Sequence, residues 1–180
     1  MQADIDRILI RGDRIAARVK EMADQIGRTY ADADQGLMIV CVLSGAFIFV
    51  ADLIRHLPMK MKIGLITVSS YPGKATESQG VSMLGSFQLD AAGRHVLVVD
   101  DILDTGRTLR AVQDELARQG PASLRTCVLL RKRGRAPDDV RADLVGFEIE
   151  DVFVVGYGLD YDGNYRNFPH IAVLKPHLYV

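Results

Sequence analysis

The residues best suited to chemistry lie together in one short segment, VLVVDDILDTGRTL, residues 96–109. An apolar run ends on Asp100 and Asp101, a third acid follows at Asp104, and Thr-Gly-Arg-Thr occupies 105–108. Carboxylates accept hydrogen bonds from hydroxyl groups and supply the oxygen ligands that Mg²⁺ prefers. Backbone amides at the start of a helix bind phosphate. A sugar 5-phosphate with a free diol is a ligand that satisfies both kinds of group.

The position of this segment in the predicted fold supports the same chemistry. Ligands of open parallel sheets bind beyond the carboxyl ends of strands, where loops lead into helices, and Asp100 to Thr108 is such a turn. Gly106 lets the backbone approach a phosphate closely, and the hydroxyls of Thr105 and Thr108 are further donors. A single aspartate before a helix commonly caps a turn. Three acids followed by this threonine-glycine pattern are poorly explained as a cap.

Strands and helices are predicted to alternate along the chain. The apolar residues of 11–34 recur at helical spacing, whereas 37–43 is a short continuous apolar run typical of a strand buried on both faces. We expect helices at 11–34, 48–57 and 107–119, and strands at 37–43, 62–70, 95–101, 124–130, 152–159 and 171–175. This order predicts an α/β fold with a doubly wound, mostly parallel sheet. The polar segment 71–85 is predicted to be a surface loop.

Bulk composition indicates one domain, residues 1–180, in a soluble cytoplasmic protein. The net charge of −1 gives no field that would attract nucleic acid or an anionic membrane. Cys41 and Cys127 lie in apolar runs without a CxxC partner, which indicates reduced core thiols. The four histidines are scattered, so we do not expect zinc. We also expect no signal peptide and no membrane-spanning segment.

Other nucleotide-binding motifs fit the sequence poorly. A P-loop requires GxxxxGK followed by Ser or Thr, and the chain contains no such string. GYGLDY at 156–161 begins like a dinucleotide-binding motif but has Tyr161 in place of the last glycine. An acid pair after a strand also occurs in response-regulator receivers, but there it follows the first strand, and here two predicted strands precede it.

VVDDILDTGRTL resembles the phosphoribosyl pyrophosphate (PRPP) motif of the type I phosphoribosyltransferases. Residues 143–171 are similar to the C-terminal base-binding region of hypoxanthine-guanine phosphoribosyltransferases, and LSGAFIFVADL and SSY are similar to that family's first two active-site loops. The resemblance extends from about 37 to 174. It implies a parallel sheet with a small hood, built from the C-terminal and N-terminal segments, over the base site. It also implies a flexible lid loop at about 71–85.

The resemblance assigns a role to each residue of the acidic segment. Asp100 and Asp101 would hold the ribose hydroxyls and Mg²⁺, directly or through water. Asp104 would be the general base that takes the imidazole proton of the purine. Since its unperturbed pKa is about 4, it is a weak base unless the closed site favours its protonated form. Asp104, Thr105, Gly106, Arg107 and Thr108 would hold the 5-phosphate.

The base and pyrophosphate residues follow from the C-terminal resemblance. Lys132 would donate to purine O6, Phe153 would stack on the ring, and the backbone of Val154 would pair with the base edge. Asp160 would bind a second Mg²⁺ with pyrophosphate, and Arg166 would neutralise that pyrophosphate. Without the resemblance, Phe153 would be read as core and Lys132 as part of a solvated basic run, RKRGR. Asp160 and Arg166 would be read as a surface pair.

Two loops complete the implied site. Ser44 and Gly45 would offer backbone amides to pyrophosphate, and Ser70 and Tyr71 would belong to the lid over the reacting centre. The family commonly has a basic residue where this chain has Ser44, so a cationic contact is lost there. Arg166 and Mg²⁺ would then have to neutralise more of the pyrophosphate charge.

The resemblance implies a purine salvage enzyme that converts hypoxanthine, and guanine, with PRPP to the nucleoside 5-monophosphate and pyrophosphate. One alternative is a related transferase for xanthine or a pyrimidine. Another is a PRPP-sensing regulator that binds RNA or DNA, for which RKRGR at 131–135 is the only basic cluster. The expected partners are small molecules and, as is frequent in the family, further copies of the chain in a dimer or tetramer.

Overall fold

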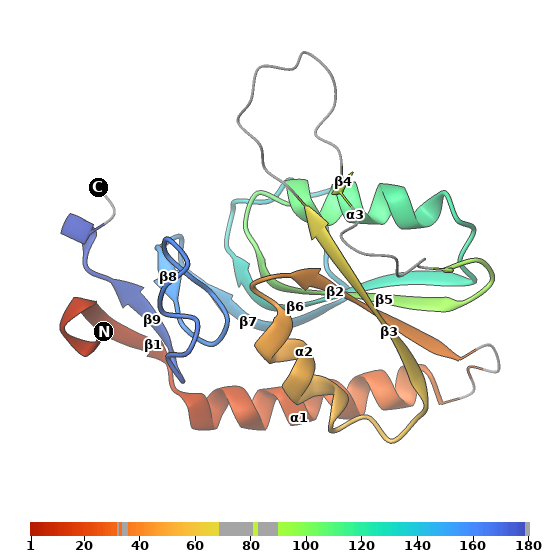
Figure 1. Ribbon diagram of the computed structural model, residues 1–180, viewed down its shortest axis with the longest axis horizontal. Coiled ribbons are helices and arrows are strands. Elements are labelled where there is room, and N and C mark those ends of the chain that lie inside the picture. The colour runs from red at the N-terminus through yellow and green to blue at the C-terminus, as the bar shows by residue number, and fades with distance from the viewer. Residues whose placement is uncertain (32, 34–35, 69–80, 83–89, 179–180) are drawn as a thin grey trace, which may run out of the picture.

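The computed structural model describes residues 1–31, 33, 36–68, 81–82 and 90–178. Its main sheet has the strand order β4-β3-β2-β5-β6-β7 (Figure 1). Strands β3, β2, β5, β6 and β7 run parallel, and β4 pairs antiparallel with β3 at one edge. The strands are β2 Leu37–Leu43, β3 Met61–Val68, β4 Val81–Ser82, β5 His95–Leu103, β6 Ser123–Lys132 and β7 Leu144–Ile149.

Helices cover both faces of this sheet. Helices α1 (Gly12–Thr29) and α2 (Phe47–Ile54) lie on one face, and α3 (Arg107–Ala117) lies on the other (Figure 1). Each helix buries an apolar stripe with a spacing of three or four residues, the spacing that places side chains on one side of a helix. In α3 this stripe is Leu109, Val112 and Leu116. The predicted doubly wound, mostly parallel architecture is confirmed.

The central strands alternate their side chains between two hydrophobic cores. In β2, Ile39 and Cys41 join the core beneath α1 and α2, whereas Met38, Val40 and Val42 join the core beneath α3. Because successive side chains of a strand point to opposite faces, a strand buried on both sides must be apolar at nearly every position. Cys41 and Cys127 are free and buried, which confirms them as core thiols.

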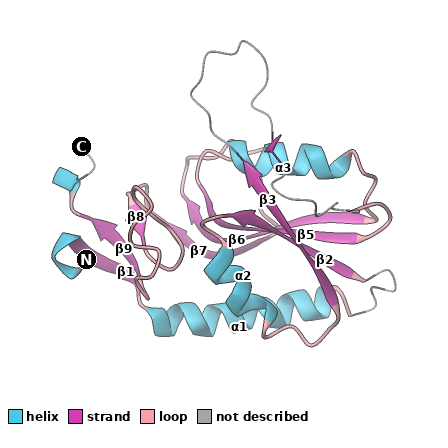
Figure 2. Ribbon diagram, in the orientation of Figure 1, coloured by secondary structure: helices cyan, strands magenta, loops and turns pink. Residues whose placement is uncertain are grey.

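A second, three-stranded sheet has the order β1-β9-β8 and lies beside the β7 end of the main sheet (Figure 2). Its strands are antiparallel: β1 Ile5–Ile10, β8 Val154–Val155 and β9 Ile171–Leu174. Short 3₁₀ helices at Gln2–Asp4 and Pro176–Leu178 flank it. Segments from the two ends of the chain therefore build one small layer, as the predicted hood requires.

Several predicted elements differ from the structure. The first helix ends at Thr29 rather than at 34. The predicted strand 152–159 is reduced to β8, because the backbone turns at Gly156, Tyr157 and Gly158, which all have positive φ. Strands β1 and β7 were not predicted. Both are half-buried edge elements with weak apolar alternation, so their sequence signal is small.

The predicted lid, 71–85, lies outside the described residues except for Val81–Ser82, which form β4. None of the helices in the described ranges is both long enough and apolar enough to cross a membrane.

Candidate active site

The acidic pair lies at the carboxyl end of β5, a central strand of the sheet. Strand β5 pairs with β2 on one side and β6 on the other, and Asp100 is opposite Val128 of β6. Asp100 is only 6% exposed, and the backbone N–H of Asp101 donates to its Oδ1 at 2.9 Å. The fold therefore holds both carboxyl groups at the edge where parallel sheets bind ligands.

This pair is electrostatically unfavourable as long as no cation or hydroxyl ligand approaches it. Burial and the adjacent charge of Asp101 raise the pKa of Asp100 well above its ordinary value. Burial also raises the pKa of Asp101, although hydrogen bonds and the charge of Arg166 oppose the shift. Among the described residues, no ion pair within 4.0 Å involves either carboxylate. A buried acid beside a partly buried one suits a divalent cation or a diol.

The segment after β5 forms a turn that leads into α3. Gly106 has φ of +77°, and a Cβ added there would lie 2.7 Å from Cγ1 of Val140, so glycine is required both for its conformation and for space. Helix α3 begins at Arg107, and its first unpaired N–H groups lie at this turn. The turn therefore has the backbone form of a phosphate site.

A cavity of about 270 Å³ joins this turn to two other loops. It is lined by residues 100–109, by Ser44 and Gly45 after β2, and by Asp160 and Arg166 from the segment between β8 and β9. The first and last of these residues, Ser44 and Arg166, are 122 positions apart in the sequence. The structure thus brings together the predicted ribose, 5-phosphate and pyrophosphate residues.

The backbones of Gly45 and Gly158 and the carboxylate of Asp101 meet closely at one side of the cavity. A Cβ on Gly45 would lie 1.6 Å from Oδ2 of Asp101, and a Cβ on Gly158 would lie 2.1 Å from the carbonyl oxygen of Gly45. The peptide between Leu43 and Ser44 is cis. Both glycines are needed because any side chain would displace the acid or the loop.

Arg166 is held at the cavity by two contacts. Its Nη2 lies 2.7 Å from Oδ1 of Asp160, and its Nη1 donates to the carbonyl oxygen of Gly158 at 2.7 Å. The guanidinium is three-quarters buried and is close enough to Asp101 to affect its pKa. Asp160 and Arg166 are therefore a paired, partly buried unit that faces the acidic motif.

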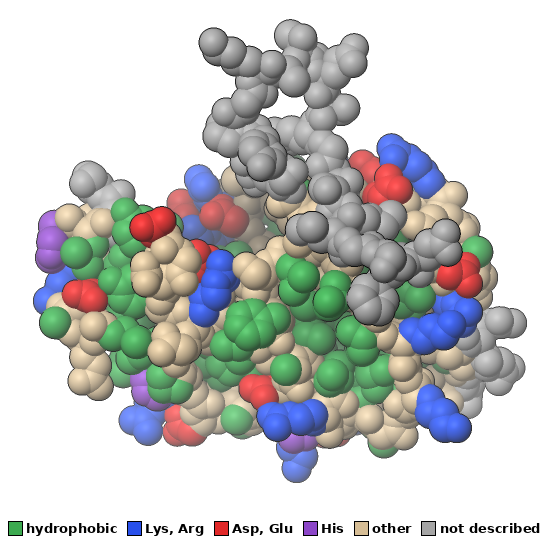
Figure 3. All heavy atoms as spheres, in the orientation of Figure 1, with side chains coloured by type: hydrophobic (Ala, Val, Ile, Leu, Met, Phe, Trp, Pro, Cys, Tyr) green, Lys and Arg blue, Asp and Glu red, His purple; other side chains and the backbone are tan. Residues whose placement is uncertain are grey.

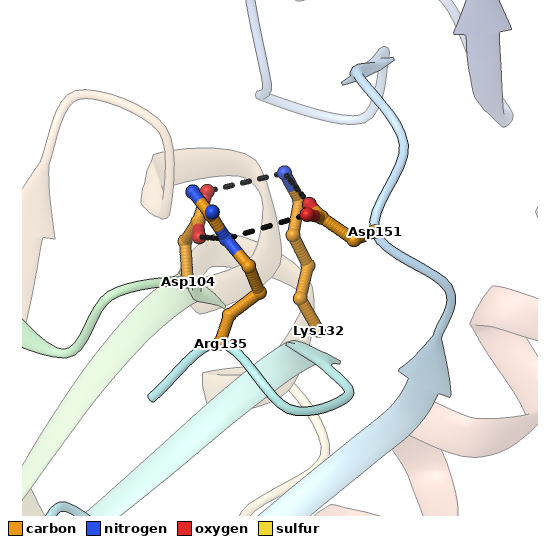
Figure 4. A network of polar contacts seen from close by, with 4 residues as sticks. All are labelled: Asp104, Lys132, Arg135 and Asp151. Atoms are coloured by element: carbon orange, nitrogen blue, oxygen red, sulfur yellow. Dashed lines mark hydrogen bonds and ion pairs between the residues drawn. The ribbon is translucent and has the colours of Figure 1, made fainter. Parts of the chain in front are cut away.

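Asp104 and Lys132 are ion-paired, with Nζ 3.1 Å from Oδ2 (Figure 4). Arg135 donates from Nε to the other oxygen of Asp104 at 2.8 Å, and Asp151 lies 3.2 Å from Nζ of Lys132. Burial acts to raise the pKa of the Asp104 carboxyl. Hydrogen bonds from Arg135 and Lys132 outweigh that effect and hold the pKa below its ordinary value. Asp104 is therefore ionised at neutral pH.

The remaining predicted residues lie nearby or outside the described chain. Phe153 is half-buried, two residues after Asp151, and its ring meets Tyr161 edge to face at a centroid distance of 5.6 Å. Val154 is buried in β8, opposite Val173 of β9. Ser70 and Tyr71 fall outside the described residues.

Sequence reasoning missed three residues of this region: Arg135, Asp151 and Gly158. Arg135 is part of RKRGR, whose charge density indicates a solvated surface, and Asp151 immediately precedes an apolar run. No local pattern connects either of them to Asp104, 31 or 47 positions earlier in the chain. Gly158 had a signal, since glycines at alternate positions in GYG indicate an irregular backbone.

Comparisons with known proteins agree with this geometry. Residues 8–162 match the phosphoribosyl transferase domain family. The hypoxanthine-guanine phosphoribosyltransferase of Mycobacterium bovis is 42% identical over 98% of this chain and 89% of its own length. That of Bacillus subtilis is 37% identical over 99% of this chain and 98% of its own. The chain belongs to the hypoxanthine-guanine phosphoribosyltransferase family.

Solved structures of family members share the fold of this phosphoribosyltransferase over nearly its whole length. A ternary substrate complex of the Trypanosoma cruzi hypoxanthine phosphoribosyltransferase superposes with a TM-score of 0.90 at 38% identity, covering 99% of this chain and 100% of that one. A hypoxanthine-guanine-xanthine phosphoribosyltransferase of Tritrichomonas foetus is 38% identical over 99% of this chain and 97% of its own length. The recognised family resemblance and the enzyme class are confirmed.

Proposed function

We propose that this enzyme transfers the phosphoribosyl group of PRPP to hypoxanthine or guanine. The observation that carries the proposal is the pairing of Lys132 with Asp104 at 3.1 Å. It places a hydrogen-bond donor beside an acceptor. A 6-oxopurine presents the complementary pair on one edge, the acceptor O6 beside the imidazole N–H. The same edge of adenine carries an amine donor at C6, which Lys132 cannot satisfy.

The proposed reaction is a substitution at C1 of the ribose. The purine nitrogen N9 forms a bond to C1, the bond from C1 to pyrophosphate oxygen breaks, and the imidazole proton at N7 passes to Asp104. The carboxylate is ionised in the free enzyme, which is the state a general base needs. A purine that stacks on Phe153 and pairs with the backbone of Val154 would lie with N7 towards Asp104.

The ribose and its phosphate would occupy the acidic end of the cavity. Asp100 and Asp101 would accept hydrogen bonds from the ribose diol. The backbone of 104–108, with the hydroxyls of Thr105 and Thr108, would hold the 5-phosphate at the start of α3, where the helix dipole favours an anion.

Magnesium fits the donor set of the acidic pair. The carboxylates of buried Asp100 and partly buried Asp101 line the cavity and form no ion pair with a Lys or Arg side chain among the described residues, and hard oxygen donors are what Mg²⁺ requires. No group of three or more His, Cys, Asp or Glu that could hold a metal converges in the described ranges. Pyrophosphate and water would therefore supply further ligands. When bound, the ion would neutralise the departing pyrophosphate.

The pyrophosphate itself would contact the loop after β2. Ser44 and Gly45 offer their amides, and Arg166 offers a guanidinium that Asp160 and Gly158 hold in place. Asp160 would be a second oxygen ligand for a Mg²⁺ bound with pyrophosphate.

The chain offers an apolar surface for a second copy of itself. Ile63 and Leu65 lie on the sheet face that α1 and α2 cover elsewhere, since they pair with the core residues Ile39 and Cys41, yet both are about two-fifths exposed. Phe47, at the start of α2, is similarly exposed, and hydrophobic side chains gather over α2 and β3 (Figure 3). We propose that two copies of the chain contact each other through this surface. We also propose that the enzyme works in the reducing cytoplasm, where free buried thiols such as these two are ordinary.

A turnover assay tests the proposed function. The protein is incubated with hypoxanthine, PRPP and Mg²⁺, and nucleoside monophosphate is measured, with Asp104→Asn as the control. Mg²⁺-dependent product from the wild type alone supports the proposal. A salt-sensitive shift of RNA or DNA without turnover would support the regulator instead. The basic residues of 131–135 offer little support for it, because Arg131 and Arg133 pair with Glu148, while Lys132 and Arg135 pair with Asp104 and Asp151.

A further inference from the structure

Four side chains of alternating charge form a closed ring at the base site (Figure 4). Asp104 contacts Lys132, Lys132 contacts Asp151, Asp151 contacts Arg135, and Arg135 contacts Asp104, over distances of 2.8 to 3.5 Å. Lys132 is the last residue of β6, and Asp104, Arg135 and Asp151 come from the loops after β5, β6 and β7. Two of these residues, Asp104 and Lys132, have roles in the proposed reaction, and the other two have none assigned.

The side chain of Lys132 is more deeply buried than the other three of the ring. Its side chain is 10% exposed, whereas those of Asp104, Arg135 and Asp151 are 35%, 43% and 49% exposed. A buried ammonium group loses hydration and needs charged partners to replace it. The contacts to Lys132 therefore carry more free energy than a fully exposed ion pair would.

The donors of Lys132 are enough for both acids and a base. An ammonium group has three N–H donors. Oδ2 of Asp104 accepts one of them at 3.1 Å, and Oδ1 of Asp151 lies 3.2 Å from the same nitrogen as an ion pair. Acids from two different loops therefore hold the ammonium group in place, and it keeps N–H donors for a base. Arg135 steadies the arrangement by binding the remaining oxygen of each acid.

We propose that Asp151 is a positioning residue of the reaction, which holds the ammonium group of Lys132 so that one of its N–H donors points to purine O6. The inference rests on the proposed function and adds a residue to it. Asp151 does not touch the reacting atoms. Its effect passes through Lys132, so it should matter for binding a 6-oxopurine and should not matter for binding PRPP.

The test is a double-mutant cycle measured with hypoxanthine and PRPP. Asp151→Asn keeps the shape of the side chain and removes its charge. In the wild-type background it should raise the KM for hypoxanthine about tenfold, the scale of a hydrogen bond to a charged group, with kcat and the KM for PRPP within about twofold. In the Lys132→Ala background the same change should have no further effect, because the two residues act as one unit.

Two controls keep the outcome clear. Glu150→Gln neutralises the neighbouring acid, which pairs with Arg7 on the small sheet, and should leave both KM values unchanged. Asp151→Glu keeps a carboxylate and should recover part of the lost affinity. An equal loss from Asp151→Asn with and without Lys132 would overturn the inference while wild-type turnover upholds the function. Absence of wild-type turnover with either purine would overturn both.

Discussion

Gly45 lies so close to Asp101 that a Cβ on the glycine would be 1.6 Å from the carboxylate oxygen Oδ2. The loop expected to bind pyrophosphate and the acid expected to hold the ribose are therefore in tight contact. A displacement of the loop must also move the carboxylate of Asp101. This coupling explains why position 45 is a glycine in the loop that is proposed to bind pyrophosphate.

Gly45→Ala should therefore reduce kcat/KM for PRPP by about 10²-fold, the effect of misplacing a catalytic group by roughly 1 Å. Gly27→Ala, in α1, is the matched control. A Cβ added to Gly27 would lie 3.8 Å from Cδ of Pro58, an ordinary contact, and alanine is the better helix former. The free energy of unfolding should therefore rise by about 0.5–1 kcal/mol with activity unchanged. Steady-state kinetics and thermal denaturation measure both. Full activity in Gly45→Ala would refute the close packing.

Asp104→Asn should lower kcat by about 10²–10⁴, because the amide keeps the shape of the carboxylate but cannot accept a proton. The dissociation constant of PRPP, measured by calorimetry without a base, should rise by a far smaller factor than kcat falls. Near-normal turnover in this variant would show that Asp104 is not the general base.

The activity should be insensitive to the titration of Asp104 near neutral pH. The pKa of Asp104 in the free enzyme lies below its ordinary value of about 4, so the carboxylate stays ionised until the pH falls below that value. Arg135→Gln removes a hydrogen bond that lowers this pKa. The acid limb of kcat/KM, which reports the free enzyme, should then move to higher pH. Arg133→Gln, in the same loop, should not move it.

Arg166 should carry much of the pyrophosphate charge, because Ser44 supplies no cation. Arg166→Gln should weaken pyrophosphate binding by about 1.5–3 kcal/mol, the usual size of a hydrogen bond to a charged group. Adding Ser44→Lys to that variant should restore part of the affinity. Inhibition by pyrophosphate at fixed Mg²⁺ measures both, and an unchanged inhibition constant in Arg166→Gln would remove the arginine from this role.

The acidic motif and the parallel sheet were predictable because their signals are local. Apolar runs identify strands buried on both faces, and a phosphate turn requires particular residues at adjacent positions. The helix at 107–119 and the thiols Cys41 and Cys127 were predicted for the same reason. The short β8 was over-extended to 152–159, because the apolar run outweighed the signal of the two glycines on either side of Tyr157, where the backbone turns with positive φ.

The ring around Lys132 could not be predicted, because it depends on three loops meeting in space. Sequence alone leaves Arg135 in a basic run that resembles a solvated surface, and it leaves Asp151 as one acid among several. The low pKa of Asp104 has the same origin. It depends on two cations 28 and 31 residues away, and only the fold places them against the carboxylate.

The selectivity among purine bases tests the central claim most directly. Lys132 can only donate, so a site built around it should accept O6 and oppose the amine of adenine. With PRPP and Mg²⁺ fixed, kcat/KM is measured for hypoxanthine, guanine, xanthine and adenine in the wild type and in Lys132→Ala. The kcat/KM for adenine should be lower than that for hypoxanthine by roughly 10⁴–10⁵-fold. Lys132→Ala should lower kcat/KM for hypoxanthine without raising kcat/KM for adenine. Comparable efficiencies for adenine and hypoxanthine in the wild type would contradict the assignment of Lys132 and the 6-oxopurine function.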